Sequence, residues 1–362
     1  MKYSNRLFVG GLAAAALLLS LGVPVGQVSL AAGAILYVDA DATGANDGTS
    51  WTDAYSELQL ALDAAVSGDQ IWVAEGTYKP SVEYGGTGSR YQSFQMKNGV
   101  AIYGGFAGTE SLLEQRDWVT HVTIFSGDLN GDDGPGFTNY AENSYHVFFH
   151  PAALVLDSSA ILDGFTIRGG NANDVGPHAQ GGGMYNYYCS PTLMNVTFTL
   201  NMATFGGGMF NDNLSEPVLT AVTFTANYGG PEGGGMANYF RSSPRLTDVV
   251  FNGNDASEGG GMYDYYYSSP VLTNVVFFDN TAGFEGGGMS NLDYSNPTLV
   301  NVTFAGNDAG MAGGMYNDNS DPILINAIFW DLPTVEIYNN SSSTPHISYS
   351  DIKVGCPTYA IC

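Results

Sequence analysis

The chain has 362 residues, and its 35 acidic residues against 10 Lys and Arg give a formal net charge of −25. Only 12% of the residues are charged, 44% are hydrophobic, and 48 residues are Gly. This composition excludes coiled coils and bulk disorder, and the negative charge argues against nucleic acids and anionic lipid surfaces, whose phosphates attract Lys and Arg.

Residues 1–32 are predicted to be a signal peptide. Lys2 and Arg6 precede an apolar run at residues 12–21, and small residues at 31–34 offer cleavage sites. A membrane anchor needs about 20 apolar residues, and a proline interrupts this run early. We therefore expect a secreted or cell-surface protein whose mature chain has no membrane span.

Residues 33–150 are predicted to hold an N-terminal cap and the first, irregular coils of a repeated fold. Within them, residues 55–66 form the one amphipathic helical stretch. Its apolar side consists of Leu58, Leu62, Ala65 and Val66. Such a helix is expected to cover the end of a solenoid, where the core and the strand edges are otherwise exposed.

A loop in this segment has the alternating oxygen side chains of a calcium-binding loop. Asp128, Asn130 and Asp132 are the candidate ligands, because a hard cation such as Ca²⁺ prefers oxygen. The loop departs from the usual pattern at position six, which is Asp133 instead of Gly, and at position twelve, which is Asn139 instead of Glu. A calcium site and an ordinary polar turn both remain open at this stage.

Residues 151–330 are predicted to form a β-helix with six repeats of about 26 residues, starting near residue 181. The motif Gly-Gly-Met recurs with Met at positions 184, 209, 236, 262, 289 and 315. A Pro-x-Leu motif follows each Met, and an apolar run then ends in Phe at positions 198, 224, 251, 277, 304 and 329. Asn or Asp stands two residues after each Met, and Asn stands three residues after the first five Phe. The same residues recur at the same positions in six successive units, which indicates a repeat architecture.

Each repeat predicts one coil of an all-β parallel solenoid. A unit holds only short strand-like pieces bounded by Gly, Pro, Asn and Ser, and none holds the 10–12 residues of helical periodicity that an α-solenoid needs. Strands of successive coils then pair at about 4.8 Å, and Met, Leu and Phe stack inward as columns. A buried Asn is expected to pair its amide with the Asn of the next coil.

The repeats resemble a known class of protein. Gly-Gly-x-Met followed by Phe-x-x-Asn is similar to the repeats of polymorphic outer-membrane proteins, and Tyr37-Val38-Asp39-Ala40 resembles the start of large exported bacterial β-helix proteins. This resemblance implies a right-handed, single-stranded parallel β-helix of the pectin-lyase-like class, a surface or secreted location, and adhesion. Enzymes of that class that act on uronate polymers use basic residues, whereas the six repeats hold only Arg241 and Arg245. That type of enzyme is therefore disfavoured.

A column of acidic residues stands four positions before Met. Glu232, Glu258 and Glu285 occupy it in three successive repeats, so they are expected to lie about 5 Å apart. Stacked carboxylates of this kind are candidates for catalytic residues of a glycosidase or for a divalent cation site such as Ca²⁺. The alternative is a solvated turn whose side chains splay apart.

Aromatic residues recur in the loop between Met and Pro. Those at the third to fifth positions after Met are Tyr187, Tyr188, Tyr239, Phe240, Tyr265, Tyr266, Tyr267 and Tyr294. An exposed aromatic edge mixed with Asp and Asn suits stacking on sugar rings, since tyrosine offers a rigid apolar face and a polar tip. The alternative is a packed column that only covers the corner of the coil.

Residues 331–362 are predicted to close the C-terminal end, because the repeat pattern dissolves after Phe329. Cys356 and Cys362 are close enough in sequence to form a disulfide in an exported protein, although free thiols are an equal alternative. Three cysteines without paired histidines give no zinc signal.

We therefore expect a non-catalytic β-helix protein of the cell surface or extracellular space that binds glycans or cell-envelope material through the aromatic loops. The first alternative is a carbohydrate-active enzyme, either a polysaccharide lyase or a glycoside hydrolase, that uses the glutamate column. The second alternative is a structural spacer. The one cofactor for which the sequence offers ligands is Ca²⁺.

Overall fold

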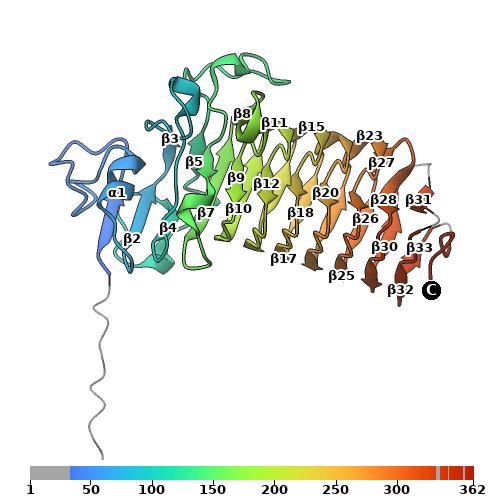
Figure 1. Cartoon of the computed structure of the whole chain (residues 1–362). Coiled ribbons are helices and arrows are strands. Elements are labelled where there is room, and N and C mark those ends of the chain that lie inside the picture. Colours follow the sequence, from blue (N-terminus) through green and yellow to red (C-terminus); the bar gives the residue numbers. More distant parts are fainter. Residues whose placement is uncertain (1–32, 332–334, 341, 354) are drawn as a thin grey trace, which may run out of the picture. The chain divides into compact units, whose positions relative to one another are not determined.

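The computed structural model describes residues 33–331, 335–340, 342–353 and 355–362. The predicted signal peptide lies outside the described residues. From residue 33 onward the chain winds into a solenoid in which each coil stacks on the one before it, as the colour gradient in Figure 1 shows. Strands of successive coils pair in parallel, so the predicted all-β parallel solenoid is confirmed.

The strands form three sheets that run along the solenoid. Sheet 1 has 19 strands, namely β1 (Ile35–Val38), β2 (Gln70–Ala74), β3 (Gly76–Tyr78), β4 (Ala101–Phe106), β5 (Thr123–Ser126), β7 (Ile161–Arg168), β10 (Thr192–Thr199), β13 (Val218–Thr220), β14 (Thr223–Thr225), β17 (Arg245–Thr247), β18 (Val250–Asn252), β21 (Val271–Thr273), β22 (Val276–Phe278), β25 (Thr298–Val300), β26 (Thr303–Ala305), β29 (Ile323–Ile325), β30 (Ile328–Trp330), β32 (His346–Ser348) and β33 (Asp351–Ile352). Sheet 2 has six strands, namely β8 (Asn171–Ala172), β11 (Met202–Phe205), β15 (Tyr228–Glu232), β19 (Asp255–Glu258), β23 (Thr281–Glu285) and β27 (Asp308–Ala309). Sheet 3 has eight strands, namely β6 (Phe148–His150), β9 (Met184–Tyr187), β12 (Met209–Asp212), β16 (Met236–Asn238), β20 (Met262–Tyr265), β24 (Met289–Leu292), β28 (Ala312–Asp318) and β31 (Val335–Asn339).

Helical segments are short and lie outside the regular coils. The α-helix α1 spans Leu58–Ala64. The 3₁₀ turns are Ser89–Tyr91, Leu113–Gln115, Tyr140–Glu142, Ala152–Leu154 and Gly176–Ala179. No helix in the described part of the chain is both long and apolar enough to cross a membrane.

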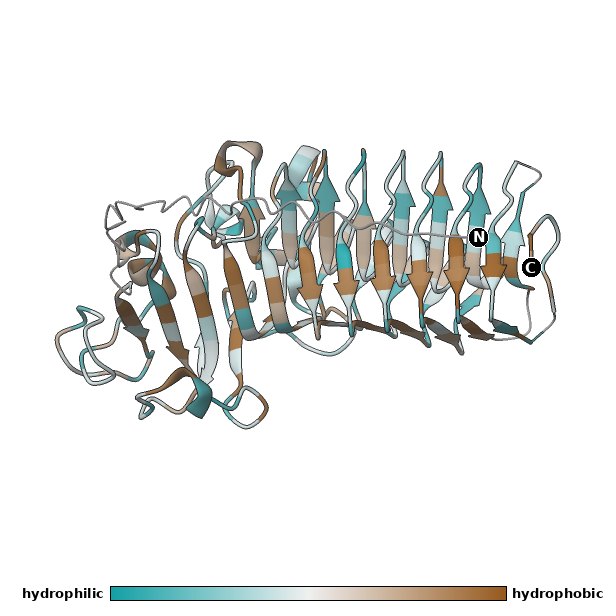
Figure 2. Cartoon of the chain, turned by 90° about the horizontal axis from the view of Figure 1, so that it is seen from below, coloured by the Kyte–Doolittle hydropathy of each residue, from teal (hydrophilic) through white to brown (hydrophobic). Residues whose placement is uncertain are grey.

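The interior of the solenoid is built from columns of identical residues. The Met of each repeat is fully buried, as predicted, and so is the Phe that ends each apolar run. Successive Phe rings from Phe198 to Phe329 stack almost parallel, with centroids 4.4 to 4.9 Å apart. Because coils repeat at about 4.8 Å, one ring per coil fills the column without gaps. Hydrophobic segments accordingly recur at matching places in successive strands in Figure 2.

Two columns of buried amides hold neighbouring coils together, as predicted. In the first column each Asn side chain donates to the Asn Oδ1 of the next coil, from Asn201 through Asn227, Asn254, Asn280 and Asn307 to Asp331. The second column follows the residue two positions after Met, from Asn186 to Asn339. Each buried amide thus gains partners that replace water.

The helix α1 packs on the first coils and corrects one sequence prediction. Leu58, Leu62 and Ala65 are buried, as expected for a covering helix. Val66 was predicted on the same face, but it is 66% exposed. The helix ends at Ala64, and Ala65 already has extended backbone, so Val66 no longer follows the helical period.

One more coil follows the sixth repeat, where the sequence pattern dissolves. Ile337 pairs with Met315, and Asn339 pairs with Asn317, so both take the places of repeat landmarks. Cys356 and Cys362 form a disulfide. The loop that they close places Ile361 beside His346 of β32 and therefore covers part of the last coil.

Candidate functional site

The outer face of sheet 3 carries a second apolar layer, outside the solenoid. In β20, Met262 and Asp264 point inward, so the alternation of a strand turns Tyr263 and Tyr265 outward. A buried cluster of Phe149, Tyr185, Phe210, Ala237 and Tyr263 covers this face. Four of these residues stand one position after Met, and Phe149 of β6 lies in the same column, paired with Tyr185. The outward residues three positions after Met pack against this cluster, and they include Tyr187, Tyr239, Tyr265 and Leu292. This face is the one that bears the predicted aromatic residues.

The turns after β9, β16, β20 and β24 carry aromatic side chains into solvent. We call Tyr188, Phe240, Tyr266, Tyr267 and Tyr294 the tyrosine ridge. These five side chains are 42% to 49% exposed. All five have positive φ, between 47° and 66°. A left-handed backbone at a bulky residue costs about 1–2 kcal/mol, and here it ends the strand and turns the side chain away from the core.

Four of the five ridge side chains, from Phe240 to Tyr294, form a continuous surface over three coils, whereas Tyr188 lies two coils before Phe240, with Asn213 and Leu214 in the coil between them. The ridge is held by its backbone. The Tyr266 ring contacts Phe240 and Tyr267, with centroids 5.5 and 5.1 Å away, and Tyr267 stacks on Tyr294 at 5.0 Å. The Tyr267 N–H donates to the Asp293 carbonyl of the next coil at 2.9 Å, and equivalent bonds join the neighbouring turns. The ridge is therefore an ordered surface.

A shallow hollow opens on the N-terminal part of the ridge. Its volume is about 270 Å³. It is lined by Tyr188, Asn213, Leu214, Phe240, Arg241 and Tyr266. Aromatic walls beside an amide and a guanidinium combine stacking surfaces with hydrogen-bond donors.

The eight aromatic residues singled out in the sequence fall into two groups. The five ridge residues are exposed, whereas Tyr187, Tyr239 and Tyr265 are half-buried against the apolar layer. The repeat period does not separate the two groups, because residues three and four positions after Met recur with the same period. The residue at the third position faces the apolar layer, whereas the residue at the fourth position faces solvent. The packed group supports the exposed group from below.

The glutamate column lies along the edge of the same face. Glu232 pairs with Glu258 and Glu258 pairs with Glu285 in the parallel register of sheet 2, so the predicted adjacency is present. Burial, with help from Glu258, raises the pKa of Glu232 to about 7, and burial also raises the pKa values of Glu258 and Glu285. The Oε2 atom of Glu232 is buried and has no hydrogen-bond partner. Burial is the main cause that raises the pKa of Tyr263, and the three carboxylates raise it further. The glutamate column therefore lies beside the apolar layer, to which Tyr263 belongs.

Carboxylates arranged to hold a metal occur elsewhere in the described residues. Oxygen atoms of Asp128, Asp132 and Glu142 lie within 4.8 Å of one another, and no other group of three His, Cys, Asp or Glu side chains in the described ranges does so. Two of the predicted calcium ligands are therefore together, while Asn130 is exposed and Glu142 was not predicted from the sequence. Backbone N–H groups of Asp132 and Asp133 already donate to the Asp128 carboxylate. The polar-turn interpretation accounts for these contacts.

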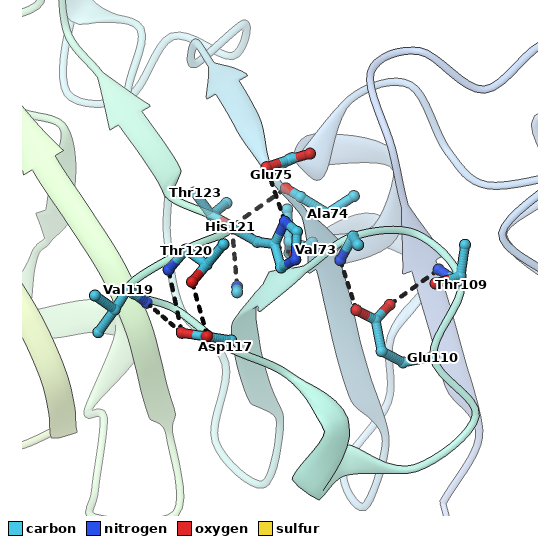
Figure 3. A network of polar contacts seen from close by, with 12 residues as sticks. Val73, Ala74, Glu75, Thr109, Glu110, Asp117, Val119, Thr120, His121 and Thr123 are labelled. Carbon is cyan, nitrogen blue, oxygen red and sulfur yellow. Dashed lines mark hydrogen bonds and ion pairs between the residues drawn. The ribbon is translucent and has the colours of Figure 1, made fainter.

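The loops of the N-terminal coils contain carboxylates of a different kind (Figure 3). His121 Nδ1 lies 3.0 Å from Glu75 Oε2. The Asp117 carboxylate accepts hydrogen bonds from Thr120 and Val119, and these bonds lower its pKa. Each of these acids has a partner that shapes its own loop, whereas Glu258 and Glu285 of the glutamate column have the hydroxyls of Tyr263 and Tyr316 as partners.

Comparison with known proteins establishes the fold. No protein-family model matches the sequence, and no curated protein matches it significantly. Among solved structures, the crystal structure of pectate lyase Pel9A matches with a TM-score of 0.51 at 14% sequence identity. The match covers 92% of this chain and 80% of the lyase chain. The chain therefore has the parallel β-helix fold of that pectate lyase.

Proposed function

We propose that this protein is exported and binds glycans at the cell surface or in the extracellular space, without catalysis, through the tyrosine ridge. The observation that carries the proposal is the ridge itself, five aromatic side chains on one face, four of them in contact, that stay exposed although the fold has an apolar layer next to them. Exposed aromatic patches on soluble proteins usually mark contact surfaces.

The spacing of the ridge suits a sugar polymer. One coil adds about 4.8 Å along the solenoid, which is comparable to the length of one pyranose ring. Tyrosine presents a flat apolar face to the ring and a hydroxyl to the sugar hydroxyls. The backbone bonds between turns fix these side chains before a ligand arrives, which lowers the entropy lost on binding.

A panel of soluble and insoluble polysaccharides tests this proposal. The purified protein is incubated with each polymer, and both the retained fraction and new reducing or unsaturated ends are measured. We expect retention without new ends, and we expect the double variant Tyr266→Ser/Tyr267→Ser to lose it. Tyr349→Ser is the matched control, because Tyr349 is an exposed tyrosine with a φ of 52° outside the ridge. Retention unchanged in the double variant would refute the role of the ridge.

A second candidate function is glycoside hydrolysis, and the glutamate column is the observation that favours it. The pKa of Glu232 is about 7, and Glu258 is its neighbour, so one carboxyl would hold a proton while the other is ionised. In this case new reducing ends would form steadily and disappear in Glu258→Gln. A protein that folds but neither retains nor cleaves any polymer would instead be a spacer.

A further inference from the structure

A positive side chain lies on the tyrosine ridge. The six repeats hold two Lys or Arg residues, which are Arg241 and Arg245. Arg245 begins β17 and is exposed on the outer side of sheet 1, because the next residue, Leu246, points inward. Arg241 follows Phe240 in the turn after β16 and lines the hollow on the ridge. Within the repeats, the aromatic face therefore carries its one cation at the hollow.

The Arg241 guanidinium has no carboxylate partner among the residues that the structure describes. The ion pairs found there both lie before the repeats. The guanidinium instead lies over the Tyr267 ring, with its central carbon 5.7 Å from the ring centroid. The backbone N–H of Arg241 donates to the Tyr266 carbonyl at 3.0 Å, which fixes the turn that carries the side chain. A cation thus remains available beside aromatic rings, in a chain where 35 acidic residues face 10 Lys and Arg.

The walls of the hollow suit one sugar unit next to that charge. Tyr188, Phe240 and Tyr266 supply aromatic surfaces on which a sugar ring can stack. Asn213 adds an amide, which is held by a hydrogen bond from its Nδ2 to Asp212 Oδ1 at 3.0 Å. The volume of about 270 Å³ lies just below the usual range of small-molecule pockets, so it fits a single unit of a polymer.

The charges around the hollow limit how many anionic groups a ligand can carry. A guanidinium pairs with a carboxylate or a sulfate through two parallel N–H···O bonds. Two coils further along the ridge, Asp293 occupies the turn position that Phe240 has here, and its charge would repel a second anionic group. The net charge of −25 also repels polyanions at longer range. The surface therefore favours one anionic group among neutral sugars over a run of anionic sugars.

We propose that the hollow on the tyrosine ridge binds one anionic sugar unit of an otherwise neutral glycan, with the carboxylate or sulfate of that unit paired to Arg241 and the neighbouring sugar rings stacked on the ridge. This inference rests on the proposed glycan binding and adds the class of glycan. Carboxylate and sulfate offer the guanidinium the same pair of oxygen atoms, so the test includes both.

The test uses three neutral polysaccharides, namely a soluble β-glucan, a galactomannan and pullulan. Each is compared in four forms, which are unmodified, lightly oxidised to carboxylates at the primary hydroxyls, almost fully oxidised, and lightly sulfated. Affinity for the purified protein is measured by biolayer interferometry at neutral pH, at low and at high salt. We expect a lightly oxidised or lightly sulfated form to bind about fivefold more tightly than its unmodified parent. The almost fully oxidised form should bind more weakly than the lightly oxidised one, and high salt should shrink both differences.

Substitutions of the two arginines test the assigned contact. Arg241→Gln should bring the affinities for the unmodified and the lightly charged forms together, because it removes the charge that distinguishes them. Arg241→Lys should keep part of the preference, since it retains the charge without the planar fork. Arg245→Gln is the matched control, because it removes the same charge from the same repeat on a different sheet, and it should keep the full preference. A preference that persists in Arg241→Gln would overturn the proposal.

The outcomes also separate this inference from the proposed function. Tyr266→Ser/Tyr267→Ser should weaken binding of both the unmodified and the lightly charged forms. Equal affinities for these forms, lost together in the double variant, would overturn the anionic selectivity and keep the ridge as a glycan site. Binding of no polysaccharide in any form would overturn both.

Discussion

The column of buried amides behind the aromatic face contains one residue that must hold a proton. From Asn186 to Asn317, the Asn side chains of this column donate from Nδ2 to Oδ1 of the next coil at 2.7 to 2.9 Å, but Asp264 replaces Asn in the fourth repeat. Asp264 accepts from Asn238 at 2.7 Å and faces Asn291 in the register of sheet 3. Oδ2 of Asp264 and Oδ1 of Asn291 are both buried without a partner. A protonated Asp264 would donate to Asn291 and complete the column, whereas an ionised one would place two acceptors face to face.

Burial raises the pKa of Asp264 well above its ordinary value, which agrees with this hydrogen-bond count. The folded protein therefore binds a proton that the unfolded chain releases near pH 3.9. Stability is complete below that pH and falls as pH rises toward the folded pKa, by about 1.4 kcal/mol per pH unit. Asp264→Asn supplies the missing donor without a proton. The variant should match the wild type near pH 4 and exceed it by up to about 4 kcal/mol at pH 7.

The assay is urea unfolding of the wild type and of Asp264→Asn at several pH values from 4 to 7. The difference in unfolding free energy between the two proteins isolates Asp264, because all other acids are common to both. Asp308→Asn is the control, since Asp308 is exposed and lies outside the column of buried amides. A difference that stays flat for Asp264→Asn, or a less stable variant at pH 7, would show that Asp264 is ionised and that the reasoning is wrong.

Three further predictions concern the core and the cap. Phe251→Ala removes a ring stacked on the Phe rings of both neighbouring coils and should lower the unfolding free energy by about 3–5 kcal/mol in urea titrations. Val66 is exposed, so Val66→Lys should change the unfolding free energy by less than about 0.5 kcal/mol. Asn254→Ala leaves the Asn227 backbone N–H and the Phe224 carbonyl without their side-chain partner and removes one of the two hydrogen bonds of Asn227 Nδ2. It should lower the unfolding free energy by about 3 kcal/mol or more, with Asn254→Asp less harmful at low pH. Burial lowers the pKa of His146 to about 3, so nitrogen chemical shifts should show a neutral ring down to pH 4, and stability should fall as pH drops below 6.5.

The sequence predicts the fold well because, in a solenoid, residues that are one repeat apart in the chain become neighbours in space. Met236 and Met262 are 26 residues apart in the chain but adjacent in the register, so a repeated letter in the sequence is a stacked column in space. The same reasoning correctly placed Glu232 beside Glu258. It required no knowledge of any side-chain conformation.

The remaining features depend on contacts that period does not encode. The last coil keeps its register although Ile337 replaces Met, because either apolar side chain fills that column. Glu142 joins Asp128 through the path of an irregular loop. The division between packed Tyr265 and exposed Tyr266 is decided by one left-handed residue at the end of a strand. Each of these outcomes is set locally, by turn geometry.

Residues in the inner columns of the solenoid can vary less freely than residues in the outer columns. This difference helps to distinguish residues required by the fold from residues that serve a function. Inside, a change of residue must satisfy the coil above and the coil below, which is why Asp264 has to carry a proton to replace Asn. Outside, Tyr187, Leu292 and Asp318 share one column without such a condition, since solvent and the apolar layer accept each of them. Aromatic and acidic residues that gather in outer columns are therefore not required by the stacking of the coils. The tyrosine ridge and the glutamate column are such gatherings, and the polysaccharide panel tests whether the ridge binds a ligand.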